Sequence, residues 1–388
     1  MATHWSGGQY SLFRLVFGIY LGGFFAARAG LDWIHVQAVS ERWFLVPMAF
    51  FPLHDALVER LSAGLGLVAA LSFGLGYRDR LAAWLLFFFY PWHDPGSGLQ
   101  FVVPPVHFLL VLHCFVPAGP YGSWPSRNRP DPAGSWHLPG AVPQLVWIYL
   151  GGSLIALGLR LLMTGFWPEG PATPAGGRIT FPWPEVSAHA QAALGVVFLL
   201  VPVLALWRRP RFFVWCSLAL LLLLLIGPDH PLFGLELIPL FLLAFDPGWF
   251  PPAALRNPDY LFYDGHCGIC HATVRFILAE DPGARFFRFA PLQGPTFQAL
   301  VGSDRPLPDS VVIRGRQGEL AVRSDAVVLI GRRLGGFWGL LAMVGNLVPR
   351  FLRDGAYRVV ARFRHRLLKP RQDVCPILAP HLRGRFED

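Results

Sequence analysis

Two cysteines three positions apart, Cys267 and Cys270, have the spacing best suited to chemistry in this chain. The apolar run 260–263 predicts a short buried strand, and apolar residues recur at helical spacing up to Leu278. Both cysteines therefore fall in the first turn of a predicted helix, where free N–H groups and the helix dipole favour a thiolate. A thiolate attacks disulfides, and a second thiol nearby can release the mixed disulfide. The spacing predicts a redox dithiol.

Three other interpretations of these cysteines stay open. The run Cys267-Gly-Ile-Cys270-His271 also has the spacing of a c-type haem attachment site. The pair could form half of a zinc site, with Cys375, His266 and His271 as further ligands. The cysteines could also be buried and inert. Redox exchange is the leading interpretation.

Roles within the dithiol follow from position. Cys267 lies nearer the exposed turn and would attack, whereas Cys270 would resolve the mixed disulfide. Asp264 directly follows the predicted strand. It could take or return a proton if burial raises its pKa.

The composition predicts an integral membrane protein with a smaller soluble part. Of 388 residues, 54% are hydrophobic and only 15% are charged, against roughly 25% charged residues in soluble domains. The net charge of +9 comes from basic residues concentrated after residue 255, which indicates retention beside anionic lipid rather than nucleic-acid binding. Five scattered cysteines do not form the disulfide framework of a secreted protein and suit a reducing compartment.

The first 250 residues are typical of an α-helical polytopic membrane domain of about eight spans. A linker (251–258) and an α/β domain (259–388) follow. The first span could instead be a cleaved signal peptide, because Ala27-Arg28-Ala29 resembles a cleavage site. The eight apolar segments are 10–27, 57–76, 81–91, 101–116, 145–163, 188–207, 212–226 and 232–245.

The arginines between these segments predict the orientation. Loops two, four and six are basic, and loops three and seven contain no lysine or arginine, although Arg42 and Arg178 lie in other odd loops. Eight spans would then place both termini in the cytoplasm, in a multi-pass protein of the cytoplasmic membrane. This orientation argues against haem attachment, which normally happens on the outer side. The basic-loop residues are Arg78, Arg80, Arg127, Arg129, Arg208, Arg209 and Arg211.

Polar residues of the odd loops and the outer leaflet form a second candidate site. Ionisable residues inside a span are costly and indicate function by default. They could line an outward-facing pocket for a metal, a quinone or another small molecule. They could equally cap helices, with Arg160 paired to Glu236. The candidate pocket residues are His54, His93, Asp94, His107, Arg160, Asp229, His230 and Glu236.

The C-terminal residues predict a thioredoxin-like order of elements. Strands are expected at 285–289, 310–313 and 319–322 after the first strand and helix. Ser324 and Asp325 are expected to cap a helix over 326–333, followed by helices over 337–344 and 354–368. A thioredoxin-like fold carries a cis-proline beside its dithiol, and Pro308 is the candidate.

Residues 259–386 resemble the DCC family of thiol-disulfide oxidoreductases. The resemblance implies a thioredoxin-like fold and redox cysteines, but no substrate. It rests on motif residues along the whole domain: Tyr263-Asp264-Gly265, Cys267-Gly268, Cys270, Phe289-Ala-Pro-Leu-Gln293, Arg323-Ser324-Asp325-Ala326, Pro349, Asp354, Tyr357, Arg362, Cys375-Pro376 and Arg385-Phe386. Ser324 and Cys375 are therefore supporting candidates beside the dithiol.

Residues 9–250 resemble the HTTM membrane domain, which is related to vitamin K-dependent gamma-carboxylase. The matching runs are Ser11–Gly18, Pro117–Ser123 and Phe245–Trp249. Carboxylase chemistry uses a membrane-domain lysine as base, whereas the single lysine here is Lys369, outside that domain. The resemblance therefore does not extend to carboxylation.

Three functions are compatible with these features. The first is a membrane-held thiol-disulfide oxidoreductase that exchanges electrons with protein or small-molecule thiols, or with a membrane quinone. The second is a lipid- or quinone-modifying enzyme that uses the outward-facing pocket, with the dithiol as an accessory. The third is a non-catalytic transporter or docking partner. All three place the chain in a lipid bilayer, and none involves nucleic acid.

Overall fold

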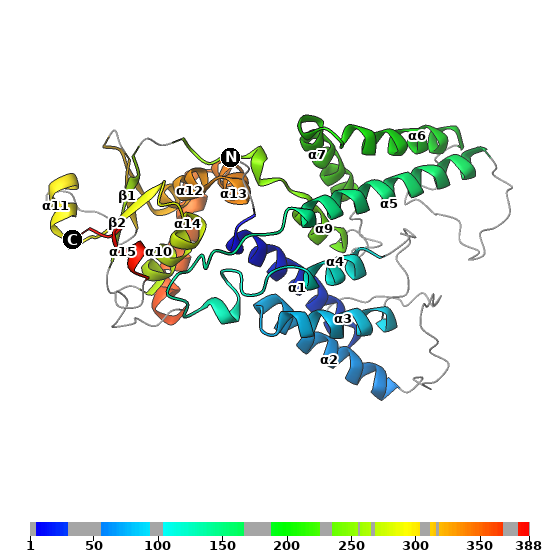
Figure 1. Cartoon of the computed structure of the whole chain (residues 1–388), viewed down its shortest axis with the longest axis horizontal. Helices are drawn as coiled ribbons and strands as arrows, with labels where there is room; N and C mark the ends of the chain where they lie inside the picture. Colours follow the sequence, from blue (N-terminus) through cyan, green and yellow to red (C-terminus); the bar gives the residue numbers. More distant parts are fainter. Residues whose placement is uncertain are drawn as a thin grey trace. The chain divides into compact units, whose positions relative to one another are not determined.

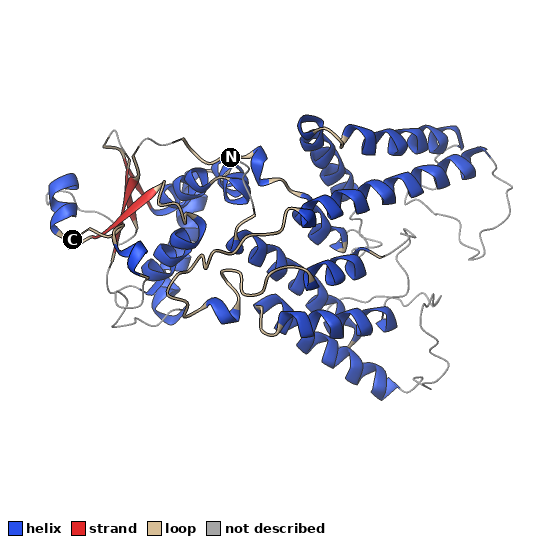
Figure 2. Ribbon diagram, viewed as in Figure 1, coloured by secondary structure: helices blue, strands red, loops and turns tan. Residues whose placement is uncertain are grey.

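The computed structural model is mostly helical, with one small sheet (Figure 2). The chain divides into two compact units. Unit 1 comprises Met1–Leu12, Pro117–Leu138 and Pro247–Asp388, and unit 2 comprises Phe13–Val116 and Pro139–Asp246. The structure describes residues 5–29, 56–93, 104–166, 188–225, 235–254, 257–264, 268–302, 311–315, 318–367 and 379–387.

The helices of unit 2 fall on the eight apolar segments predicted from the sequence. The first of them begins in unit 1 and continues into unit 2. They are α1 (Gly7–Arg28), α2 (Ala56–Leu75), α3 (Asp79–His93), α4 (Pro105–Cys114), α5 (Ala141–Phe166), α6 (Ala188–Leu204), α7 (Arg208–Leu225) and α9 (Leu237–Ala244) (Figure 1).

The described part of the chain has two candidate spans rather than the eight predicted. Among the residues that the structure describes, only α1 and the Ala141–Leu159 part of α5 are long and apolar enough to cross a membrane. Helices α4 and α9 have 10 and 8 residues. At 1.5 Å per residue they extend roughly 12–15 Å, about half of a ~30 Å hydrocarbon core. Two candidate spans suggest membrane association and leave the number and orientation of spans open.

Glycines allow two neighbouring helices of unit 2 to approach closely. Helices α5 and α6 lie side by side (Figure 1). A Cβ on Gly158 would lie 2.8 Å from the carbonyl oxygen of Gly195, and a Cβ on Gly195 would lie 2.8 Å from that of Gly158. Close backbone approach through small residues is a common way for apolar helices to pack.

Unit 1 contains a four-stranded mixed sheet with the order β2-β1-β3-β4. β1 pairs with β2 in parallel and with β3 antiparallel, and β3 pairs antiparallel with β4. The strands are β1 (Asp259–Tyr263), β2 (Phe287–Pro291), β3 (Val312–Arg314) and β4 (Leu320–Val322). All four predicted strands are present.

β2 begins two residues later than predicted because its approach is tied into a turn. The Asp281 carboxylate accepts hydrogen bonds from the backbone N–H groups of Arg285 (2.9 Å) and Phe286 (3.0 Å). A side chain that binds backbone groups competes with strand pairing in this way. Regular pairing with β1 starts at Phe287.

The two faces of the sheet bury different residues, because side chains alternate along a strand. One face packs Leu261, Phe289 and Ile313 against Ile277 of α10 and Ile330 of α12. The other face buries Phe262, Ala290 and Val312, with Phe297 of α11 packed against them. The helices of unit 1 beyond residue 250 are α10 (Gly268–Glu280), α11 (Pro295–Val301), α12 (Arg323–Leu334), α13 (Gly336–Leu347), α14 (Arg350–Leu367) and α15 (Pro380–Arg383).

The predicted cap of α12 is wrong. The helix begins at Arg323, its N-cap is Val322, and no side chain caps it. Ser324 is buried, and its hydroxyl instead donates a 2.5 Å hydrogen bond to the Asp354 carboxylate of α14. The Ser324 hydroxyl, predicted to cap the helix end, thus binds a carboxylate 30 residues further along the chain.

Candidate functional site

The candidate dithiol lies where β1 passes into α10. β1 ends at Tyr263, and α10 begins at Gly268 with Cys270 as its third residue. Cys267 directly precedes Gly268 in the chain and lies outside the described residues, and of Cys270 the structure describes the backbone. The first turn of a helix presents unpaired N–H groups and the positive end of the dipole, which favour a thiolate.

Asp264 belongs to the same connection. It follows Tyr263 directly and is half-buried. His271, also half-buried, lies one turn into α10, with its ring 6.0 Å from the Tyr263 ring. The segment from the end of β1 to the first turn of α10 thus contains a carboxylate and an imidazole, together with Cys270. The other candidates of this site, Pro308 and Cys375, lie outside the described residues.

The far end of α10 is fixed by a carboxylate that collects three donors within unit 1. Glu280 accepts hydrogen bonds from the hydroxyl of Ser6, from the backbone N–H of Gly8 (3.0 Å) and from the indole N–H of Trp338 (2.5 Å). Burial raises the pKa of Glu280, and the three donors oppose that shift by favouring the carboxylate. The helix that carries Cys270 is thereby tied to the N-terminal segment and to α13.

A buried ion pair holds the chain end against β2. The Arg385 guanidinium donates to the Asp281 carboxylate at 2.8 Å, and the side chains are 6% and 0% exposed. Arg385 also donates to the carbonyl oxygens of Asp281 (2.7 Å) and Phe287 (3.1 Å). Burial lowers the pKa of Arg385, while Asp281 opposes the change. Asp281 directly follows α10, so this pair also fixes the end of the dithiol helix.

Residues of the DCC-like motif hold α14 on α12. Besides the Ser324–Asp354 hydrogen bond, Asp325 pairs with Arg350 at 2.9 Å and with Arg353 at 3.3 Å. Their observed role is to position helices. Ser324, predicted as a supporting residue of the dithiol site, lies in this helix contact.

Of the predicted outward-facing pocket, the structure describes the side chains of His107 and Glu236 alone. His54, Asp94, Asp229 and His230 lie outside them, as do the side chains of His93 on α3 and Arg160 on α5. His107 is half-buried on α4 and packs its ring against Phe87 and Tyr90, with centroids 5.2 and 5.6 Å away. Glu236 is buried. Within the described part of the chain, no group of three His, Cys, Asp or Glu residues could hold a metal ion.

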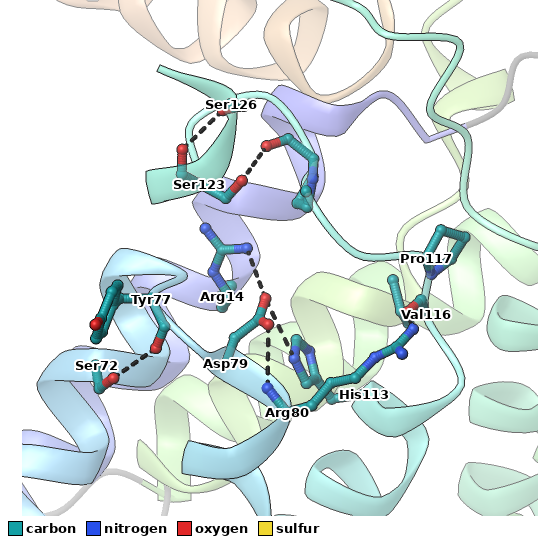
Figure 3. Close-up of polar contacts among 12 residues, drawn as sticks. Arg14, Ser72, Tyr77, Asp79, Arg80, His113, Val116, Pro117, Ser123 and Ser126 are labelled. Atoms are coloured by element: carbon teal, nitrogen blue, oxygen red, sulfur yellow. Dashed lines mark hydrogen bonds and ion pairs between the residues drawn. The ribbon is translucent and has the colours of Figure 1, made fainter. Parts of the chain in front are cut away.

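Sequence reasoning missed a buried charged cluster in unit 2 (Figure 3). The Asp79 carboxylate lies 3.4 Å from the Arg14 guanidinium and 3.6 Å from Nε2 of His113. Arg14 is fully buried and His113 is 4% exposed. The backbone N–H of Arg80 also donates to Asp79, at 3.0 Å. The cluster joins α1, α3 and α4.

One signal in the sequence could have indicated this cluster. Arg14 lies in the middle of an apolar helix, and His113 lies near the end of another. A buried cation needs a partner of opposite charge, so Arg14 and His113 each indicate a nearby carboxylate. Asp79 is the acidic residue in the first turn of α3.

Comparisons with known proteins agree with the C-terminal features. Residues 261–370 match the family of DCC1-like thiol-disulfide oxidoreductases. A curated relative, "Uncharacterized protein YuxK" of Bacillus subtilis (strain 168), is 30% identical over 129 residues, which cover 32% of this chain and 91% of the relative. No solved structure matches the chain significantly.

Proposed function

Because this chain belongs, through its C-terminal residues, to the DCC1-like thiol-disulfide oxidoreductase family, we propose that it is a membrane-held enzyme whose redox pair is Cys267 and Cys270. The observation that carries the proposal is the start of α10 at Gly268, which puts Cys270 in the first helical turn. The strand order β2-β1-β3-β4, with β1 and β2 parallel, supports a thioredoxin-like fold for this part.

The proposed reaction is thiol-disulfide exchange in two steps. The Cys267 thiolate attacks one sulfur of a substrate disulfide, that S–S bond breaks, and the other substrate sulfur leaves and takes up a proton. Cys270 then loses its proton and attacks the Cys267 sulfur. This second step releases the reduced substrate and leaves a Cys267–Cys270 disulfide. Asp264, beside the helix start, is the proposed carrier of these protons.

An electron donor must then restore the dithiol. We propose a protein or small-molecule dithiol, or a membrane quinol, which is oxidised as the Cys267–Cys270 disulfide is reduced. With a substrate dithiol and an oxidising partner, the same steps run in reverse. Two apolar helices of spanning length support a location at the membrane. The HTTM-like assignment of the N-terminal part belongs to the proposal and rests on the runs in α1, residues 117–123 and residues 245–249.

Variants of single cysteines test the exchange. Cys267→Ser should abolish reduction of a disulfide-linked fluorescent peptide by the full chain, because the attacking thiolate is gone. Cys270→Ser should accumulate a mixed disulfide with the peptide, visible by mass spectrometry, because nothing releases it. Cys216→Ser removes an exposed cysteine of α7 and should leave exchange unchanged. Full activity of the Cys267→Ser protein would refute the proposed role.

The proposed location of the dithiol on the cytoplasmic side needs its own test. It rests on the basic residues of the even loops and the mostly basic C-terminal part. In intact cells, a membrane-permeant maleimide should label Cys267 or Cys270 and an impermeant one should not, until the cells are opened. Labelling by the impermeant reagent in intact cells would place the dithiol outside. This result would refute the predicted orientation without affecting the proposed exchange reaction.

A further inference from the structure

Helix α14 packs on α12, within unit 1, through its polar side. The side chains of Arg353 and Asp354 are only 14% and 18% exposed. Arg353 pairs with Asp325, and Asp354 accepts from the hydroxyl of Ser324. A surface helix usually turns its apolar stripe inward and its charged side to water. In α14 this arrangement is reversed.

The apolar side of α14 is therefore exposed. Phe351 and Leu352 are 70% and 53% exposed, and two turns later Val359 and Val360 are 58% and 52% exposed. Positions separated by eight residues lie about 80° apart around a helix, within one broad apolar stripe. At the end of α13, Leu347 is 78% exposed. We call these five residues the outer face.

Positive charge accompanies the outer face. Residues 341–367 contain six arginines and a single acidic residue, Asp354. Arg358 and Arg362 are exposed, and helical geometry places them along one edge of the apolar stripe. An apolar stripe edged by arginine is the pattern of helices that lie in the interface of an anionic bilayer. Two copies meeting through this face would oppose arginine with arginine, so charge disfavours a dimer.

We propose that the outer face of α13 and α14 lies in the surface of an anionic lipid bilayer, with its apolar residues among the acyl chains and its arginines at the headgroups. Long arginine side chains can bury their methylenes and keep the guanidinium at the phosphates. The proposal goes beyond the exchange reaction and does not depend on it. It assigns α14 as a membrane-surface helix of unit 1, in addition to any helix that spans the bilayer.

Quenching by lipid tests this placement in the full chain. An environment-sensitive fluorescent amino acid is introduced at Val359, or at Gln298, an exposed residue of α11 that serves as control. Each protein is reconstituted in nanodiscs whose acyl chains carry bromine. The nanodiscs contain either phosphatidylcholine alone or phosphatidylcholine with phosphatidylglycerol. The label at Val359 should be quenched severalfold more than the label at Gln298, and more strongly with phosphatidylglycerol.

Matched charge variants distinguish binding of anionic lipid by the outer-face arginines from attraction of the lipid by any exposed arginine of unit 1. With the label at Val359, Arg358→Gln with Arg362→Gln should lower quenching in phosphatidylglycerol to the level in phosphatidylcholine. Arg285→Gln with Arg332→Gln removes two exposed arginines elsewhere in unit 1 and should leave quenching unchanged. Equal quenching of the two labels would overturn the proposal. So would a blue-shifted but unquenched label at Val359, which would show that protein, from this chain or another copy, covers the face.

Discussion

At the scale of residues, unit 1 surrounds its candidate dithiol helix with buried polar contacts. Glu280 and Asp281, at the end of α10, bind the N-terminal segment, α13 and the chain end. None of these groups performs exchange in the proposed reaction. Their effect is to fix the end of α10, the helix whose first turn includes Cys270. A helix that shifted would offer the thiolate a weaker field.

The Arg385–Asp281 pair should therefore matter for stability. Arg385→Ala leaves Asp281 buried without its cation, and breaking a buried pair in this way costs about 3 kcal/mol. The exposed pair of Arg288 and Glu387, 2.6 Å apart, is the matched control, because surface pairs contribute less than about 1 kcal/mol. Hydrogen exchange of the β2 amides in increasing urea gives both values. Equal losses for Arg385→Ala and Arg288→Ala would contradict the account.

At the scale of elements, the sequence predicted what is local and missed what is tertiary. Apolar spacing located the eight helices of the N-terminal part and the four strands, because periodicity is a property of neighbouring residues. It could not locate the partner of Ser324, which is Asp354 on another helix, nor the meeting of Arg14, Asp79 and His113 from three helices. Eight spans were predicted from apolar content, whereas two helices of the described part of the chain are both long and apolar enough to be candidate spans.

Close helix packing offers a test at this scale. Gly158→Val should separate α5 from α6, because the new side chain meets the Gly195 carbonyl oxygen 2.8 Å from its Cβ position. Gly152 lies on the same helix, and a Cβ added there would have nothing within 4 Å, so Gly152→Val is the control. A disulfide between cysteines placed on α5 and α6 should form several times more slowly in the first variant only. Unchanged rates in both variants would show that the helices do not touch there.

At the scale of the whole molecule, the two units share the chain in an interleaved way. The chain passes between them four times, at residues 12/13, 116/117, 138/139 and 246/247. Unit 1 therefore includes Ser6 and Gly8, both donors to Glu280, which a fragment starting at residue 259 would lack. Any measurement of the dithiol should use the full chain, in which α10 keeps all of these partners.

A redox titration of the full chain tests the central claim most directly. The protein is equilibrated in glutathione buffers of increasing oxidation and alkylated, and its five cysteines are mapped by mass spectrometry. We predict that Cys267 and Cys270 lose alkylation together, as one two-electron couple joined in a disulfide. The alkylated fractions of Cys114 and Cys216 should not change with the redox potential of the buffer. The claim fails if the pair stays reduced in every buffer, if either cysteine pairs elsewhere, or if both are held by a metal ion or haem.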